Sequence, residues 1–315
     1  MHLRCCAFTC IVAYSASLAK AGAPARNSAT PEHALKCIWV ESKLWPPMDV
    51  HWHMCTWPKE MDTRISRDVQ SQGCYECGTV GEVITELREH QATLLDIGAN
   101  IGAFSLPAAA DGHAVFAFEP QPQNLARLTA SIIANEFDGR LNLIAAGLAK
   151  DPSWANLPNY RKAKNQAGPV RQANASAGTV NASRARLPLL TLRSLPRIDG
   201  PVYIKMDIDG AECGALASTD AFMNSTDIVG VSMEWWIIAR STECCTSLLG
   251  STLHIWRHVH GLVPYGRTEY GKFANRDFPV IQSKLCDAEY NKAHHTQNLI
   301  WRRQEPQGSG RGQSK

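Results

Sequence analysis

The sequence predicts an α/β fold in which helices cover both faces of a doubly wound, mostly parallel sheet. From residue 83 onward, short apolar runs alternate with stretches of helical periodicity, a rhythm typical of parallel strands joined by crossover helices. The first run leads into a glycine-rich turn, and several runs end in acidic residues. A chain of 315 residues, 44% of them hydrophobic, can bury one sizeable core.

The expected elements follow one another in a regular order. Short apolar runs bounded by turn-forming residues predict the strands. Leu125, Leu128, Ile132 and Ile133 lie on one face of a helix at 123–135, as helical periodicity requires. The predicted strands are 94–97, 114–118, 141–146, 187–192, 202–206, 228–233, 262–265 and 298–301, and the predicted helices are 83–90, 103–110, 123–135 and 244–260.

The chain is expected to have four parts. Residues 1–23 form a signal peptide or signal anchor, because a basic start precedes an apolar run and small residues. Residues 24–82 combine a polar linker with an irregular cap rich in Cys and Trp. Residues 83–303 form the main domain, in which 150–186 is a flexible insertion because it is small, polar and basic. Residues 304–315 form a disordered tail.

The leader bears on where the protein acts. A secretory signal would place the mature chain in the lumen of the secretory pathway or outside the cell. A transit peptide to an organelle is the alternative, because no acidic residue precedes Glu32. Three of the 11 cysteines lie in the leader and eight follow it. An even number suits disulfides in an oxidising compartment but leaves their pairing open.

Two kinds of partner are not expected. The net charge of +3 is small, and basic residues show no interleaved aromatic stripe, so we predict no nucleic-acid binding. A membrane is expected as a partner only if the leader remains as an uncleaved anchor. A zinc site would need His51, His53, Cys55, Cys74 and Cys77, but no second close pair completes a familiar pattern. We therefore predict no metal site.

The segment TLLDIGANIGAF at residues 93–104 is the most informative part of the chain. An apolar run containing Asp96 is followed by Gly98 and Gly102, which allow the backbone to approach a ligand where a Cβ would collide. Glu119 ends the next apolar run, where a carboxylate can accept both hydroxyls of a ribose. A nicotinamide dinucleotide would share that ribose contact, but Asn100 stands near the place where its motif needs a second glycine. A cofactor without phosphates, such as S-adenosylmethionine, fits better.

A third segment, YIKMDIDGAE at residues 203–212, ends a strand in carboxylates. Asp207, Asp209 and Glu212 would lie at the carboxyl end of the sheet, where open α/β folds bind ligands. Such acids could steady a sulfonium, or orient or deprotonate a hydroxyl group. They could also bind a divalent cation through oxygen. Helix capping by Asp209 is the alternative without a function.

These segments together resemble the FkbM-type methyltransferases, a class I family that uses S-adenosylmethionine and typically methylates hydroxyl oxygens. LLDIGANIGAFSL resembles the first motif of the family, and AFEPQPQNLARLTASIIAN resembles the second. IKMDIDGAE resembles the KIDVEGAE signature, with Asp209 in place of the usual glutamate, and SMEWW resembles the strand that follows. Ser66, Gly73 and Glu76 resemble a lead-in segment, so the likeness spans roughly residues 60–302.

The resemblance implies a class I methyltransferase fold of the Rossmann-like type, with S-adenosylmethionine as cofactor. The acceptor would be a hydroxyl on a glycan, a lipid or a small metabolite. A nicotinamide-dependent oxidoreductase and a catalytically silent module that keeps the cofactor pocket are the alternatives. The resemblance implies that Glu119 holds the ribose and that Asp207 faces the reacting centre, and we hypothesise that Asp207 or Glu234 orients or deprotonates the acceptor. The residues implied at the amino-acid end of the cofactor are Asp96, Gly98, Asn100 and Gly102.

Overall fold

The structure is a computed structural model that describes residues 35–156, 186–195, 197–217, 219–270, 274–280, 282–293 and 298–303. The predicted leader at 1–23 and the predicted tail at 304–315 lie outside the described residues, as does most of the predicted insertion. Among the described helices, none has both the length and the apolar character that a membrane crossing requires.

The core of the fold is an eight-stranded sheet with the order β12-β11-β13-β10-β9-β3-β4-β5. Strands β10, β9, β3, β4 and β5 pair in parallel, and β13 pairs antiparallel with both β10 and β11. The chain runs outward from β3 to β5, then returns to β9 on the other side of β3, which makes the sheet doubly wound as predicted. The strands are β3 Thr93–Ile97, β4 Val115–Phe118, β5 Leu141–Ile144, β9 Pro201–Met206, β10 Asp227–Glu234, β11 Leu262–Tyr270, β12 Ala274–Pro279 and β13 Asn298–Arg303.

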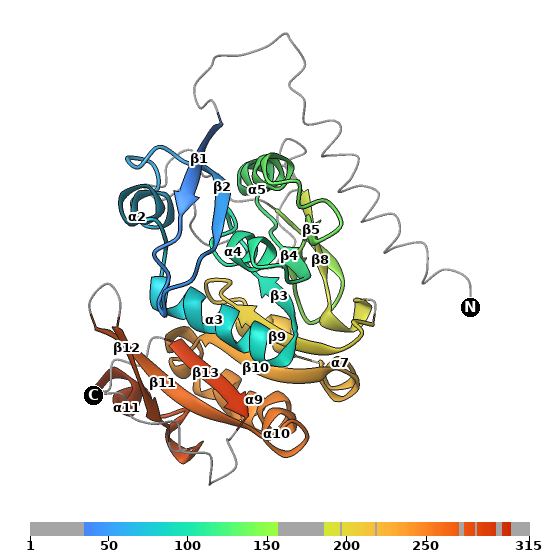
Figure 1. The fold of residues 1–315 in the computed structure, drawn as a ribbon. Helices are drawn as coiled ribbons and strands as arrows, with labels where there is room; N and C mark the ends of the chain where they lie inside the picture. The colour runs from blue at the N-terminus through green and yellow to red at the C-terminus, as the bar shows by residue number, and fades with distance from the viewer. Residues whose placement is uncertain are drawn as a thin grey trace.

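Helices cover both faces of this sheet, and the alternation of side chains along each strand divides the core in two. Leu94 packs with residues of α3, α4 and α5, whereas Leu95 packs on the opposite face with residues of α6 to α10. Figure 1 shows α3 and α4 lying across one face of the sheet. The helices are α3 Cys77–His90, α4 Ser105–Ala110, α5 Pro122–Ala134, α6 Glu212–Leu216, α7 Asp220–Ser225, α8 Trp236–Ala239, α9 Thr242–Leu249, α10 Thr252–His258 and α11 Ala288–Ala293.

The N-terminal segment, residues 35–76, packs into the same core. Its antiparallel strands β1 and β2 lie near α5, where the Cys55 N–H donates to Ser131 Oγ at 2.9 Å. The Asn135 side chain bonds both backbone groups of His53, at 2.6 and 2.7 Å. Since α3 begins at Cys77, it crosses the boundary that we expected between residues 82 and 83. The elements of the segment are β1 Lys36–Glu41, β2 His51–Thr56 and α2 Ile65–Gln72.

A small three-stranded sheet, with the order β6-β8-β7, stands beside the main one. Its strands are β6 Gly147–Leu148, β7 Ser153–Asn156 and β8 Arg186–Leu190. The insertion expected at 150–186 therefore begins with a regular strand, β7, which pairs antiparallel with β8. Residues 157–185, for which flexibility was predicted, lie outside the described residues.

The prediction of one helix at 244–260 was wrong. The chain forms two helices, α9 and α10, separated by Gly250 and Ser251. Ser251 has φ −126° and ψ −99°, outside the helical region. Helical periodicity of side chains continued across the break, and therefore the pattern concealed it.

Four disulfides join the eight cysteines that follow the leader. The pairs are Cys37–Cys55, Cys74–Cys77, Cys213–Cys244 and Cys245–Cys286. The three cysteines of the zinc alternative are therefore held in disulfides, which removes the thiolates that such a site would need.

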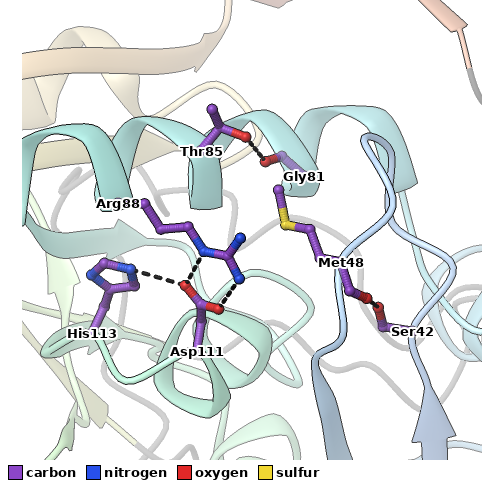
Figure 2. Close-up of polar contacts among 7 residues, drawn as sticks. All are labelled: Ser42, Met48, Gly81, Thr85, Arg88, Asp111 and His113. Atoms are coloured by element: carbon purple, nitrogen blue, oxygen red, sulfur yellow. Dashed lines mark hydrogen bonds and ion pairs between the residues drawn. The ribbon is translucent and has the colours of Figure 1, made fainter.

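An ion pair fastens α3 to α4 at the end of the sheet where β3 and β4 begin (Figure 2). Arg88 binds both carboxylate oxygens of Asp111, with an Nε–Oδ2 distance of 2.8 Å, and His113 Nε2 lies 3.1 Å from Oδ2. The Asp111 side chain is only 8% exposed. This cluster stabilises the end of the sheet opposite to the candidate site, since residues 90–93 and 113–115 lead into the strands.

Candidate functional site

The turn after β3 is held against the neighbouring strands by its backbone. The N–H groups of Gly98 and Ala99 both donate to the carbonyl oxygen of Phe118, at 3.0 and 2.9 Å. Gly98 has φ +86°, and a Cβ added there would overlap the carbonyl oxygen of Asp207. At this position only glycine combines the left-handed backbone with the close approach of the loop after β9.

The structure gives these two glycines a reason that the sequence did not show. The place that a Cβ would take at each is occupied by the protein itself. At Gly98 the neighbour is the backbone of Asp207, and at Gly102 an added Cβ would lie 2.6 Å from Leu128 Cδ1 and 2.8 Å from Leu106 Cγ. The glycines bring the β3 turn into contact with α4, α5 and the loop after β9, and they shape the site by that packing.

Glu119 connects the ends of β3 and β4. Its carboxylate is buried, with Oε2 accepting from the Asn100 N–H at 2.9 Å and Oε1 accepting from the Gln121 N–H at 2.7 Å. Burial raises the pKa of Glu119 to about 7, although these hydrogen bonds act in the opposite direction. Each carboxylate oxygen retains further acceptor capacity, and a ligand could use it.

A cavity of about 680 Å³, partly open to solvent, lies at the carboxyl ends of β3, β4 and β9. Gly98, Asn100, Glu119 and Asp207 all line it, together with Asp209. Residues from three separate strand ends thus share one space, at the position where an open α/β sheet changes its winding direction.

The opposite wall of this cavity is apolar. It is contributed by β6, β8 and neighbouring residues, which the sequence did not connect with the site. Its members include Ala146, Leu148, Leu187 and Leu189. A carboxylate beside an apolar slot suits a ligand that carries both hydroxyl groups and a flat heterocyclic ring.

Three of the predicted site residues, Asp96, Gly102 and Glu234, are not among the residues that line the cavity. Asp96 is fully buried, and its Oδ2 accepts from Ser105 Oγ at 2.6 Å. Its Oδ1 lies 3.4 Å from Lys205 Nζ, which in turn donates to the carbonyl oxygen of Gly98 at 2.9 Å. Asp96 therefore acts on the site through Lys205, which holds the glycine turn.

A cluster of three carboxylates extends from the cavity toward β10. Asp207, Asp209 and Glu234 each offer a carboxylate oxygen, and these oxygens lie within 4.8 Å of one another. Burial raises the pKa of Glu234 to about 8, with a further increase from the charge of Asp207, although Trp236 Nε1 donates to Glu234 Oε1 at 2.6 Å. Burial and Asp207 raise the pKa of Asp209 to about 6. The cluster can therefore exchange protons near neutral pH.

Two residues that interact electrostatically with this cluster, Arg64 and Tyr75, were not predicted from the sequence. Arg64 Nη2 donates to Tyr75 Oη at 3.1 Å. The signal that could have found them is the lead-in resemblance, which drew attention to Ser66, Gly73 and Glu76 instead. Ser66 Oγ accepts from the Trp57 N–H at 3.0 Å, and Gly73 follows the last residue of α2, so the contacts of those two are structural.

The sequence model of the methyltransferase FkbM domain matches residues 96–235. This part of the chain is an FkbM methyltransferase domain, and it contains the glycine turn, Glu119 and the carboxylate cluster. The protein is therefore a methyltransferase that uses S-adenosylmethionine. The match decides against a nicotinamide cofactor, which was the main alternative.

Solved structures that resemble the chain are also methyltransferases. The C-terminal domain of precorrin-6Y C5,15-methyltransferase from Rhodobacter capsulatus is 14% identical, with 71% of this chain and 86% of that chain covered and a TM-score of 0.33. Precorrin-6y C5,15-methyltransferase from Geobacter metallireducens is 13% identical, with 70% and 84% covered and a TM-score of 0.29. Comparison with curated proteins gives no match. Because these scores are low, the fold class rests on the strand order and the family match.

Proposed function

We propose that the protein transfers the methyl group of S-adenosylmethionine to a hydroxyl oxygen on a glycan, a lipid or a small metabolite. One observation carries this proposal. A carboxyl group with a raised pKa, Glu234, lies beside Asp207, which lines the cofactor cavity. A hydroxyl group is a poor nucleophile until its proton is removed, and a nearby carboxylate with a pKa near the working pH is suited to remove it.

The residues that line the cavity fit the cofactor. Glu119 would accept the ribose hydroxyls, and the backbone at Gly98 and Asn100 would contact the amino-acid end. The apolar wall with Leu148 and Leu187 would contact the adenine ring. Asp207 lines the same cavity and would face the positively charged end of the cofactor. Asp96 and Gly102, which we also expected at the cofactor, would support this arrangement from inside the protein.

When bound, S-adenosylmethionine supplies a methyl group on a positively charged sulfur. The task of the chain is to hold the acceptor in line with that methyl group and to keep water away. Asp207 would orient the acceptor hydroxyl and Glu234 would take its proton. The hydrogen bond from Trp236 Nε1 to Glu234 Oε1 leaves Oε2 as the oxygen that would accept the proton.

We also propose that the protein acts in the secretory pathway or outside the cell. Support comes from the apolar leader and from the four disulfides, because disulfides persist in oxidising compartments. The acceptor would then be a small molecule or a glycan of that compartment. Nucleic acid is not proposed as a partner, and a membrane is proposed only if the leader stays as an anchor.

Two measurements test the proposal. Calorimetric titration with S-adenosylmethionine and with NAD should show binding of the first alone. Transfer of a radiolabelled methyl group into glycan, lipid and metabolite fractions should then identify the acceptor, and NMR of the product should show an oxygen-bound methyl group. Cofactor binding without transfer to any fraction would favour the silent module, and a product methylated on carbon or nitrogen would refute hydroxyl methylation.

A further inference from the structure

We propose that Asn224 is a site of N-linked glycosylation. The triplet Asn224-Ser225-Thr226 has the acceptor pattern N-x-S/T, with no proline in the middle. Two other such triplets begin at Asn174 and Asn181, and both lie outside the described residues. Because so short a pattern also recurs by chance, the place of Asn224 in the fold has to show that it can carry a glycan. The inference rests on the proposed compartment and does not depend on the methyl acceptor.

Asn224 lies in the last turn of α7, on the side of the helix that faces solvent. Phe222 and Met223 are 7% and 0% exposed and belong to the core, whereas Asn224 and Ser225 are exposed. The two buried side chains fix the helix on the protein. A glycan on the exposed asparagine would therefore extend away from the core.

The side-chain amide of Asn224 makes a hydrogen bond that glycosylation can preserve. Asn224 Nδ2 donates to the carbonyl oxygen of Asp220 at 2.8 Å. An asparagine amide nitrogen carries two hydrogens, and attachment of a sugar replaces one of them. The remaining N–H can still donate to Asp220, so the folded helix is compatible with the modified side chain.

The transfer needs a donor and an accessible acceptor triplet. With a lipid-linked oligosaccharide pyrophosphate as donor, Asn224 Nδ2 forms a bond to C1 of the first sugar, the bond from C1 to the pyrophosphate oxygen breaks, and Nδ2 loses a proton. Thr226, the third residue of the pattern, is only 6% exposed in the folded protein. The modification is therefore expected on the entering chain, before β10 packs into the sheet.

The site is far from the cofactor cavity. Asn224 comes shortly before Asp227, the first residue of β10, which pairs with Pro201, the first residue of the parallel strand β9. It thus lies at the amino ends of these strands, whereas the cavity lies at the carboxyl ends of β3, β4 and β9. The eight residues of β10 span about 25 Å at about 3.3 Å per residue. A glycan on Asn224 would leave the cavity open.

A disulfide surrounds the same stretch of chain. Cys213 and Cys244 form a disulfide, and Asn224 lies within the loop that this bond closes. Disulfides form and persist in oxidising compartments such as the lumen of the secretory pathway, where asparagines of this pattern are modified. The disulfide and the glycosylation pattern therefore indicate the same compartment.

The experiment isolates residue 224 from the other two triplets. The full chain with Asn174→Gln and Asn181→Gln is produced in a eukaryotic secretory host and treated with peptide N-glycosidase in ¹⁸O-labelled water. Treatment should increase its mobility on a denaturing gel, and mass spectrometry should find heavy-oxygen aspartate at residue 224. Both signals should be lost in Asn224→Gln.

Thr226→Ser and Thr226→Val are a matched pair, because serine keeps the hydroxyl group of the pattern and valine keeps the shape of the buried side chain. The gel shift should remain in the serine variant and disappear in the valine variant. A chain that is secreted with Asn224 unmodified would overturn the proposal, as would a shift that persists in Thr226→Val.

Replacing residues 1–23 with a strong secretory leader separates this proposal from the proposed compartment. Modification of Asn224 with both leaders would support both proposals. Modification with the foreign leader alone would support the site and refute the proposed compartment. An unmodified Asn224 in a chain secreted by the foreign leader would refute the site, whatever compartment the native leader selects.

Discussion

Replacing Glu234 with glutamine removes a proton acceptor while preserving the shape of the site. The amide oxygen of glutamine can still accept from Trp236 Nε1, as Glu234 Oε1 does at 2.6 Å. Glu234 is not among the residues that line the cofactor cavity, so the affinity for S-adenosylmethionine should stay within about twofold of wild type. Loss of a general base typically lowers the rate by about 10²–10⁴-fold, and we expect kcat to fall by that amount.

The pH dependence of the methyl-transfer rate is a second test of the role of Glu234. With a pKa of about 8 for Glu234, about a tenth of the carboxyl groups are ionised at pH 7. The rate of the wild-type protein should therefore rise about tenfold between pH 7 and a plateau above pH 9. In Glu234→Gln this rise should disappear, and only the low residual rate should remain.

The free energy of unfolding provides a control, because Glu234→Gln should raise stability while it lowers activity. The folded protein raises the pKa of Glu234 from its ordinary value of 4.5 to about 8, so the folded state binds this proton more tightly than the unfolded chain. The contribution of the group to stability is fully present below pH 4.5 and is lost as the pH rises through 8. Relative to wild type, Glu234→Gln should gain stability between these pH values in urea unfolding. An unchanged kcat and an unchanged pH profile in the variant would refute the role of Glu234.

Three further changes test other parts of the structure. Glu119→Ala should weaken binding of S-adenosylmethionine about 10- to 100-fold, since hydrogen bonds to a charged group contribute about 1.5–3 kcal/mol, and calorimetry showing unchanged affinity would exclude the ribose contact. Gly98→Ala should destabilise the protein by more than about 2 kcal/mol, because an added Cβ overlaps backbone. Gly112 also has a positive φ but has open space around it, so Gly112→Ala should cost only about 1–2 kcal/mol. Equal losses of stability in thermal unfolding would contradict this comparison. Asp111→Asn should lower the free energy of unfolding by about 1 kcal/mol through its bond with Arg88 without altering cofactor affinity, and a loss of affinity would show that the two ends of the sheet are coupled.

Much of the fold was accessible from local patterns. Alternating apolar runs and helical stripes depend on side-chain periodicity within ten or so residues. This is why β3, β4, β5, β8, β9 and β10 were expected close to where they lie, whereas the short strands β6 and β7 were not expected. The break between α9 and α10 was missed because the stripe of apolar residues continues through it. The antiparallel insertion of β13 between β10 and β11 was missed because pairing partners are not encoded in the pattern of a single strand.

The candidate site likewise has features that the sequence determined and features that only the tertiary structure determined. The sequence by itself determined the types of group at the strand ends, with Glu119 after β4 and Asp207 after β9, because turn chemistry and strand ends are local properties. Only the tertiary structure decided that Asp96 and Gly102 face inward, that the cysteines pair as they do, and that Arg64 and Tyr75 meet. These outcomes depend on contacts between residues far apart in the chain, where packing and the burial of charge select one arrangement among many that the local pattern allows.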